Sequence, residues 1–211
     1  MSSARNLFVL GATGRTGQHL VSQALEQGHT VTAFVRDPAR LKVAHERLQV
    51  SGWSSADNAA QVGDLMRGHD AVISTLGVPA FKSGGFIERS VRTLVPAMER
   101  AGVRRLIFAS AFGVLDSHDL PFVPRTMQRL LLGDVYADKA AGEAIIRASR
   151  LDWTLVYPSM LSSGPRTGRY RVGERLALRG LPKISRADLA EFLLTQVDDA
   201  TNVRKGVLVT S

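Results

Sequence analysis

The sequence predicts an α/β fold, a doubly wound parallel sheet of about seven strands with helices on both faces. Three observations support this prediction. Short runs rich in β-branched and aromatic residues alternate with longer helical patterns along all 211 residues. A glycine-rich turn joins the first strand pattern directly to a helical pattern. No repeat, low-complexity tract or linker interrupts the chain, so residues 1–211 are expected to form a single domain.

The expected elements follow one another in a regular order. Strand patterns occupy residues 6–10, 30–36, 47–51, 71–76, 104–109, 153–157 and 206–210. Helical patterns occupy residues 17–27, 57–67, 85–101, 135–149 and 186–197. Gly28 and Gly102 follow two of these helices as C-terminal caps. Pro96 lies inside the pattern at residues 85–101, where it is expected to kink the helix because it removes the hydrogen bond to the carbonyl of Arg92.

Two longer segments, residues 113–133 and 162–182, interrupt this alternation. The first contains Pro121 and Pro124, and the second holds five arginines against a single glutamate. Both follow strand patterns and are expected to project from the carboxyl edge of the sheet, where open α/β sheets bind ligands. We interpret them as substrate-side covers of the site.

Composition excludes several classes of protein. Without cysteine, the chain has no disulfide framework, thiolate zinc site or cysteine nucleophile. The net charge is +8, and 22 of the 27 basic residues are arginine, a side chain suited to phosphates and carboxylates. A solvated basic surface is the alternative interpretation. The basic residues are spread along the chain without interleaved aromatic residues, so a nucleic-acid partner is not expected.

The termini and apolar runs carry no targeting signal. Residues 1–6 lack the basic and apolar pattern of a secretory signal, and the longest apolar run, residues 106–115, is too short to span a membrane. We therefore expect a cytoplasmic protein without a membrane partner, as a monomer or homodimer.

The strongest motif is the glycine loop, Phe8-Val-Leu-Gly-Ala-Thr-Gly-Arg-Thr-Gly17, which joins a strand to a helix. Gly11 permits the tight turn, Gly14 lets the backbone approach a pyrophosphate, and Gly17 lets the helix pack on the strand. The N-terminus of the helix then offers free N–H groups to the anion. This context predicts a Rossmann-type dinucleotide site rather than an ordinary glycine-rich turn.

The G-x-x-G-x-x-G spacing resembles the extended and atypical branch of the short-chain dehydrogenase/reductase superfamily. Further motifs lie at residues 34–40, 70–77, 110–112, 151–158, 164–170 and 184–189. With them, nearly the whole chain is similar to the NAD(P)H-binding family of flavin reductase and biliverdin-IXβ reductase, to which NmrA-like redox sensors are related. The resemblance implies a Rossmann-type fold and a nicotinamide cofactor.

The end of the second strand bears on the choice of cofactor. A carboxylate there would bind the ribose 2′-hydroxyl of NAD(H), whereas an arginine would bind the 2′-phosphate of NADP(H). Arg36 and Asp37 are adjacent, and side chains alternate along an extended segment, so only one faces the ribose. Arg15 and Arg40 add positive charge nearby, and the resemblance also places Arg36 on the phosphate. NADP(H) is therefore favoured over NAD(H), with a solvated Arg36 as the alternative.

The resemblance implies roles for further residues. Those matching the pyrophosphate and ribose cradle are Thr13, Thr16, Leu76 and Gly77, and those beside the nicotinamide are Pro158, Ser159 and Met160. Lys139 matches a basic residue near the nicotinamide ribose, although a simple helical pair with Glu143 is an equal alternative. Relatives have Gly-Asp where this chain has Gly52-Trp53. Trp53 is expected either to stack on adenine or to belong to the core.

The catalytic pattern of short-chain dehydrogenases is incomplete. Their tyrosine protonates an alkoxide and is followed four residues later by a lysine, but Tyr136 and Lys139 are three residues apart. Flavins, quinones and linear tetrapyrroles accept hydride into conjugated systems and can take a proton from water. We therefore expect such an acceptor, oriented by Ser110 as the catalytic polar group. A strand-end hydrogen bond is the alternative role for Ser110.

The remaining motifs concern metals and the substrate. The five histidines are scattered, so no metal site is expected. Arg169 and Arg171 flank Tyr170 and would point the same way from an extended segment, as substrate residues for an anionic acceptor. Two functions remain: an NADPH-dependent reductase of a flat conjugated acceptor, for example a flavin as substrate, or a non-catalytic NAD(P)H sensor that binds a partner protein.

Overall fold

The computed structural model describes residues 3–53, 58–78, 83–114, 125–178 and 180–211 of the chain. Its strands are β1 (Asn6–Leu10), β2 (Thr30–Val35), β3 (Leu48–Gly52), β4 (Ala71–Ser74), β5 (Arg105–Ala109), β6 (Asp152–Pro158), β7 (Met160–Ser162), β8 (Arg171–Gly173), β9 (Lys183–Ser185) and β10 (Lys205–Thr210). Its helices are α1 (Arg15–Glu26), α2 (Ala59–Met66), α3 (Phe86–Ala101), α4 (Arg125–Ala148) and α5 (Arg186–Thr195), with short 3₁₀ turns η1 (Pro38–Arg40) and η2 (Phe112–Val114).

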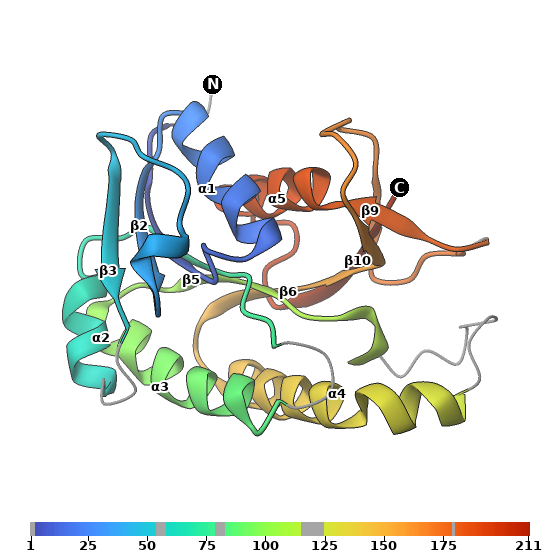
Figure 1. Ribbon diagram of the computed structural model, residues 1–211. Helices are drawn as coiled ribbons and strands as arrows, with labels where there is room; N and C mark the ends of the chain where they lie inside the picture. Colours follow the sequence, from blue (N-terminus) through green and yellow to red (C-terminus); the bar gives the residue numbers. More distant parts are fainter. Residues whose placement is uncertain (1–2, 54–57, 79–82, 115–124, 179) are drawn as a thin grey trace.

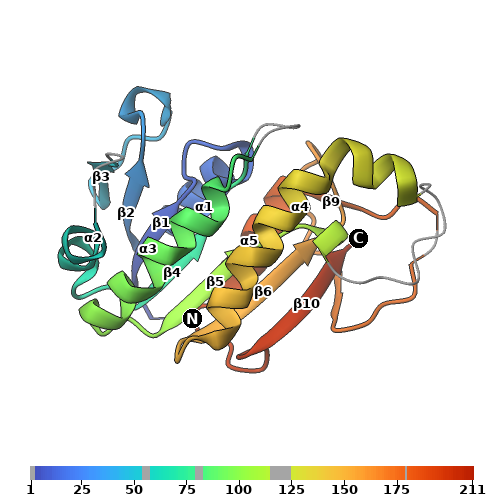
Figure 2. The same cartoon turned by 90° about the horizontal axis from the view of Figure 1, so that it is seen from below.

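The main sheet has eight strands in the order β3-β2-β1-β4-β5-β6-β10-β8. The seven strands predicted from the sequence all form it and pair in parallel, whereas β8 is antiparallel to β10 at the edge. Helices α1 and α5 cover one face, and α2, α3 and α4 cover the other (Figure 1; Figure 2 shows the second face). The doubly wound α/β prediction is confirmed.

Apolar side chains on both faces of the sheet form two cores. One packs β1 and β2 against α1 and α5, and the other packs the opposite face against α2, α3 and α4. Every residue of β4 is buried, as expected of a central parallel strand that reads as a continuous apolar run. Both faces of the sheet are therefore covered, and ligand access is left to the edges where the strands end.

One expected helix starts at a different residue in the structure. Helix α4 begins at Arg125, ten residues before the expected start, so residues 125–133 of the segment 113–133 are helical. Pro121 and Pro124 suggested an irregular segment, but both precede Arg125 in the sequence, and proline is common at the start of a helix. Residues 115–124 lie outside the described residues. Helix α3 continues through Pro96 to Ala101.

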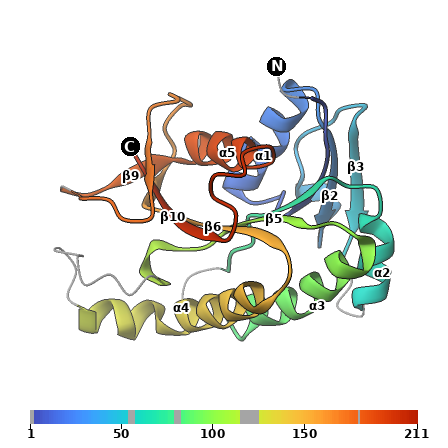
Figure 3. The same ribbon diagram turned by 180° about the vertical axis from the view of Figure 1, so that it is seen from behind.

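The segment 162–182 contains strands that the sequence did not predict. It begins in β7 and includes β8, and β7 pairs with β9 in a separate two-stranded sheet. Figure 3 shows this region beyond β10, at the end of the molecule opposite β3. Each of these strands has three residues, which is too few for an alternating pattern to be recognised.

A buried carboxylate fixes the start of this segment on α5. Asp188 accepts hydrogen bonds from the backbone N–H groups of Thr167 at 2.6 Å and Gly168 at 2.9 Å. It also accepts from the hydroxyls of Ser185 at 2.9 Å and Thr167 at 3.0 Å. Burial acts to raise the pKa of Asp188, but these four hydrogen bonds together hold it below its ordinary value.

Replacing Asp188 with alanine is expected to lower the free energy of unfolding by about 3 kcal/mol, because backbone amides bonded to a charge lose their acceptor. The wild-type contribution should be present at neutral pH and should disappear as pH falls below the ordinary carboxyl pKa. Urea unfolding at several pH values measures both effects. The matched control is Asp64→Ala, which removes only exposed ion pairs with Arg67 and Arg100. Equal losses of unfolding free energy in the two variants would contradict this structural role of Asp188.

Among the described residues, no helix combines the length and apolar content needed to cross a bilayer.

Candidate functional site

The glycine loop is packed against the end of β4. Gly11 has a φ of +79°, and a Cβ there would lie 2.7 Å from the backbone of Thr75. A Cβ at Gly17 would lie 2.1 Å from the carbonyl oxygen of Gly11, which no side chain can occupy. The hydroxyl of Thr75 is 3.2 Å from the carbonyl oxygens of both Leu10 and Gly11, to which it donates. The loop therefore requires glycine at both positions.

The N-terminus of α1 opens above this loop. Its N-cap, Gly14, is extended and has no side chain to bond the first-turn N–H groups. These groups and the helix dipole together favour an anion at this end. The geometry fits a pyrophosphate, as the glycine spacing predicts.

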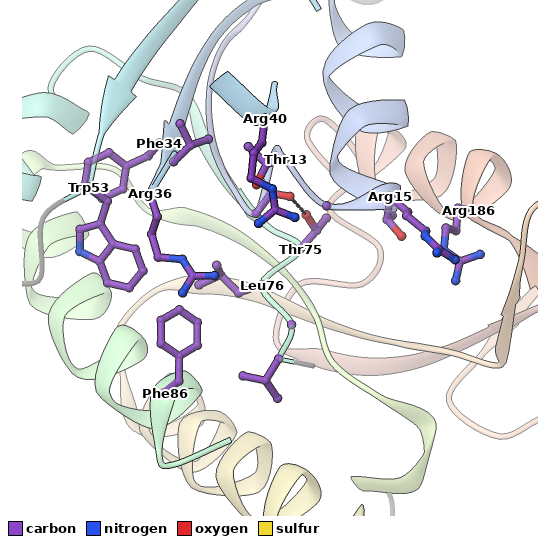
Figure 4. Close-up of a pocket in the computed structure, with 16 residues that line it drawn as sticks. Thr13, Arg15, Phe34, Arg36, Arg40, Trp53, Thr75, Leu76, Phe86 and Arg186 are labelled. Atoms are coloured by element: carbon purple, nitrogen blue, oxygen red, sulfur yellow. Dashed lines mark hydrogen bonds between the residues drawn. The ribbon is translucent and has the colours of Figure 1, made fainter. Parts of the chain in front are cut away.

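A pocket of about 450 Å³ lies over the loop (Figure 4). Nine residues expected to bind the cofactor line it: Gly11, Thr13, Gly14, Arg15, Thr16, Arg36, Arg40, Leu76 and Gly77. Gly17 lies beneath it, buried in the turn. None of the sixteen described lining residues is acidic, and four are arginines. A polyanion such as a dinucleotide phosphate therefore suits the pocket.

Arg36 and Asp37 have different environments at the end of β2. Arg36 and Arg40 line the pocket. The carboxylate of Asp37 accepts a hydrogen bond from the N–H of Ala39 at 3.1 Å and so caps η1. The Arg36 guanidinium carbon lies 5.3 Å from the ring centre of Phe86, within cation–π range. The carboxylate of Asp37 is thus engaged in capping η1, whereas Arg36 and Arg40 face the pocket.

Trp53 belongs to the aromatic end of the same pocket. Its ring centre is 5.4 Å from that of Phe86 and 6.3 Å from that of Phe34. It is partly buried against the core and also lines the pocket. The sequence left two roles open for Trp53, packing in the core or stacking on the adenine ring of the cofactor, and this position is compatible with both.

A second group of polar residues is buried where β5 ends against α4. The hydroxyl of Ser110 donates to Glu143, and the hydroxyl of Tyr157 donates to the other oxygen of Glu143 at 2.5 Å. Arg147 donates to the Tyr157 oxygen at 2.8 Å. Burial, followed by the hydrogen bond to Glu143, raises the pKa of Tyr157, so this hydroxyl stays protonated. The proton of Ser110 is thus directed to Glu143, which leaves its lone pairs for any other partner.

Lys139 is buried beside this group. Its ammonium donates to the carbonyl of Ala109 at 3.4 Å and lies 5.9 Å from the ring centre of Phe108. Burial lowers its pKa to about 8, although the charges of Glu143 and Asp138 act in the opposite direction. Glu143 is bonded to Ser110 and Tyr157, so the simple surface pair between Lys139 and Glu143 is not what the structure shows.

The depressed pKa of Lys139 predicts a pH dependence of stability. The folded protein releases this proton above pH 8, whereas the unfolded chain holds it to about pH 10.5, so the free energy of unfolding should rise between these values. Because a shift of one pKa unit corresponds to about 1.4 kcal/mol, the expected rise is roughly 3 kcal/mol. Lys139→Met should remove it, and Lys205→Met, at a half-exposed position, should keep it. Urea unfolding from neutral pH upward measures the difference, and parallel curves for the wild type and Lys139→Met would contradict the prediction.

The residues expected beside the nicotinamide do not line the 450 Å³ pocket. The hydroxyl of Ser159 donates to Thr210 at 3.0 Å, Pro158 ends β6, and Met160 is 56% exposed on β7. Tyr136 is half-buried on α4, and burial raises its pKa. A short-chain dehydrogenase tyrosine needs a lowered pKa, so Tyr136 does not fit that role.

Arg169 and Arg171 are not brought to one cavity, contrary to the expectation. Arg169 lines a second pocket of about 610 Å³ together with Lys183 and Asp188. Arg171 lies in edge strand β8 and donates to the carbonyl of Ala177 at 3.3 Å. The regular alternation begins only at β8, because the preceding turn is held by Asp188 and passes through Gly168 at a φ of +65°.

Several lining residues were not predicted: Phe34, Val35, Thr75, Val78, Phe86 and Arg186. Thr75 follows β4 directly, and strand ends of this kind were a usable signal. Phe86 and Arg186 start helices far along the chain, and only the folded sheet brings them to the glycine loop. Among the described residues, no group of three metal-ligating side chains is found.

Known proteins resemble this chain over most of its length. A Bacillus subtilis (strain 168) protein, named an uncharacterized sugar epimerase, YhfK, is 29% identical over 206 residues, or 92% of this chain and 88% of that protein. An oxidoreductase of Pestalotiopsis microspora is 28% identical over an alignment of 211 residues, which covers 90% of this chain and 79% of that protein. Among solved structures, ChuY, an anaerobillin reductase from Escherichia coli O157:H7, has a TM-score of 0.80 at 22% identity, with 97% and 96% of the chains covered.

The similarity to ChuY concerns the fold alone at this identity. The model of a family described as NAD(P)H-binding, in contrast, matches residues 11–200, which include the glycine loop, Arg36 and α5. The loop geometry and the arginine-lined pocket agree with this match. This chain therefore belongs to the NAD(P)H-binding family.

Proposed function

We propose that the protein is an NADPH-dependent reductase that transfers a hydride to a flat conjugated acceptor, such as a flavin, a quinone or a tetrapyrrole. The observation that carries the cofactor half of the proposal is that Arg36 and Arg40 line the glycine-loop pocket while Asp37 caps η1. Guanidinium groups fit a 2′-phosphate, which NADH lacks. NADPH, when bound, supplies the hydride.

The chain's own residues bind and orient this cofactor. The first turn of α1 binds the pyrophosphate through its N–H groups, and the aromatic end of the pocket holds the adenine side through Trp53 and Phe86. Lys139 provides a buried positive charge at the end of β5, where the nicotinamide ribose would lie. Pro158 ends the neighbouring strand β6, and Ser159 and Met160 follow it on the same edge of the sheet.

The acceptor half of the proposal depends on proton supply. Burial raises the pKa of Tyr136, and the hydroxyl proton of Ser110 is directed to Glu143. Neither group is arranged to protonate an alkoxide. A conjugated acceptor delocalises the electrons of the hydride and takes its proton from water, so these two groups suit that class of substrate. Ser110 would then orient the acceptor as a hydrogen-bond acceptor.

We also propose that the acceptor is anionic. Arg169 and Lys183 line the 610 Å³ pocket, and the carboxylate of Asp188 in its wall is already bonded to four donors. Asp188 is buried, so the exposed side-chain charges that line this pocket are those of Arg169 and Lys183. Attraction between exposed charges is screened by salt, so rates with an anionic acceptor should fall as ionic strength rises.

The test is NADPH oxidation by the purified protein with a panel of flavins, quinones and tetrapyrroles. At least one is expected to accelerate oxidation, and at saturating NADPH anionic members should respond to salt while neutral members do not. If NADPH binds but no acceptor accelerates its oxidation, the reductase proposal is wrong and the non-catalytic sensor becomes the function. If the rates with neutral and anionic acceptors respond alike to salt, the proposal of an anionic acceptor is wrong and the reductase proposal stands.

A further inference from the structure

One face of α1 is polar and lies in a pocket of its own. Arg15, Gln18, His19 and Ser22 recur at positions i, i+3, i+4 and i+7, so they share one side of the helix. Such a face is ordinarily solvated. Here Val43, Ser163 and Arg186 complete a cavity of about 400 Å³ around these four residues.

The cavity is rich in positive charge and hydrogen-bond donors. None of its described lining residues is acidic, and Val43 is its only apolar side chain. Arg186 is half-buried and makes a single long hydrogen bond, 3.5 Å to the hydroxyl of Ser163, although its guanidinium carries five N–H groups. Arg15 and Arg186 are the first residues of α1 and α5, so two helix dipoles add their positive ends.

We propose that this cavity is a second anion site, which binds a phosphate group carried by a small monoester or free in solution. Guanidinium groups match phosphate in planar, bidentate contacts, and Gln18, Ser22 and Ser163 add neutral donors for the remaining oxygens. A volume of about 400 Å³ falls in the range of small-molecule pockets, so there is room for more than the phosphate itself.

This site shares its arginines with the glycine-loop pocket. Arg15 and Arg186 line both cavities, and Figure 4 shows them at the end of the larger pocket away from Trp53 and Phe86. An anion in the second site neutralises charge that also faces the cofactor phosphates. Phosphate should therefore weaken NADPH binding, and NADPH should weaken phosphate binding by the same factor.

The test measures phosphate binding to the purified full chain without NADPH, by phosphorus NMR or equilibrium dialysis. Ser22→Asp places a carboxylate in the cavity at its far end from the glycine loop. It is expected to weaken phosphate binding at least about tenfold, because repulsion replaces a contact. His19→Glu, on the exposed side of the cavity, is a second variant should the first fold poorly. The matched control is Gln49→Glu, an equal change of charge on exposed β3.

Three ligands distinguish the sources of the phosphate. Flavin mononucleotide binding that is far tighter than that of inorganic phosphate and of riboflavin, and that Ser22→Asp weakens, would show a monoester site in this cavity and not at the acceptor pocket. Equal binding of flavin mononucleotide and inorganic phosphate would show a site for the free ion. If Ser22→Asp and His19→Glu bind phosphate as the wild type does, the ion binds elsewhere and the proposal is wrong. No turnover is measured, so this result is independent of whether the protein is a reductase.

Discussion

Replacing Gly17 with alanine is expected to abolish dinucleotide binding. The new Cβ would lie 2.1 Å from the carbonyl oxygen of Gly11, so the loop or the start of α1 must move. The N–H groups of the first turn of α1 would then no longer converge on the pyrophosphate, and small misplacements of such donors are costly. NADPH affinity should fall by at least about a hundredfold, which is the loss of two charge-assisted hydrogen bonds.

NADPH fluorescence measures the binding, and circular dichroism shows whether the variant is folded. The matched control is Gly133→Ala in α4, where an added Cβ has nothing within 4 Å and should be neutral or slightly stabilising. Should Gly17→Ala fail to fold, Gly14→Val tests the approach to the pyrophosphate directly, because Gly14 is the exposed N-cap. A folded Gly17→Ala protein with wild-type affinity would place the dinucleotide elsewhere.

Local sequence was sufficient for the elements that local chemistry determines. The glycine loop was predicted because its tight turn and the start of α1 both follow from residues 11–17. The central parallel strands, such as β1, β4 and β5, were predicted because burial on both faces leaves each as a largely apolar run. These features depend little on distant parts of the chain.

The missed strands depend on tertiary pairing. Strand β8 exists because it pairs with β10, and β9 because it pairs with β7, and neither has a pattern of its own in three residues. The early start of α4 was missed for a different reason, because Pro121 and Pro124 carried more weight than the helix-forming residues that follow them. Local propensity therefore failed where the chain packs beyond β10.

The parts of the site were harder to predict the farther apart they lie in the sequence. Arg36 and Arg40 lie a fixed distance after the glycine loop, so a fingerprint rule finds them. Ser110 and Glu143 are 33 residues apart, and the hydrogen bond between them depends on how α4 crosses β5. No rule of sequence spacing predicts how α4 crosses β5. The sequence therefore indicated Ser110 as a site residue but not Glu143 as the acceptor of its hydroxyl proton.

Replacing Arg36 with alanine is expected to weaken NADPH binding about ten- to hundredfold, the loss of a charge-assisted contact. The reason is local: Arg36 lines the pocket, whereas the neighbouring carboxylate is held by the N–H of Ala39. NADH has no 2′-phosphate and should bind the variant nearly as well as the wild type. Titrations of both cofactors at increasing salt measure the effect, because screening should reduce the preference of the wild type for NADPH and leave the variant unaffected.

The matched control for this prediction is Asp37→Ala, the adjacent charge. Its carboxylate caps η1 and does not line the pocket, so the ratio of NADPH to NADH affinity should stay close to that of the wild type. Two outcomes would contradict the assignment. Equal losses of both cofactors in Arg36→Ala would show that Arg36 supports the pocket without touching a 2′-phosphate. A ratio that changes only in Asp37→Ala would show that the carboxylate turns from Ala39 to bind the ribose, and the preferred cofactor would then be NADH.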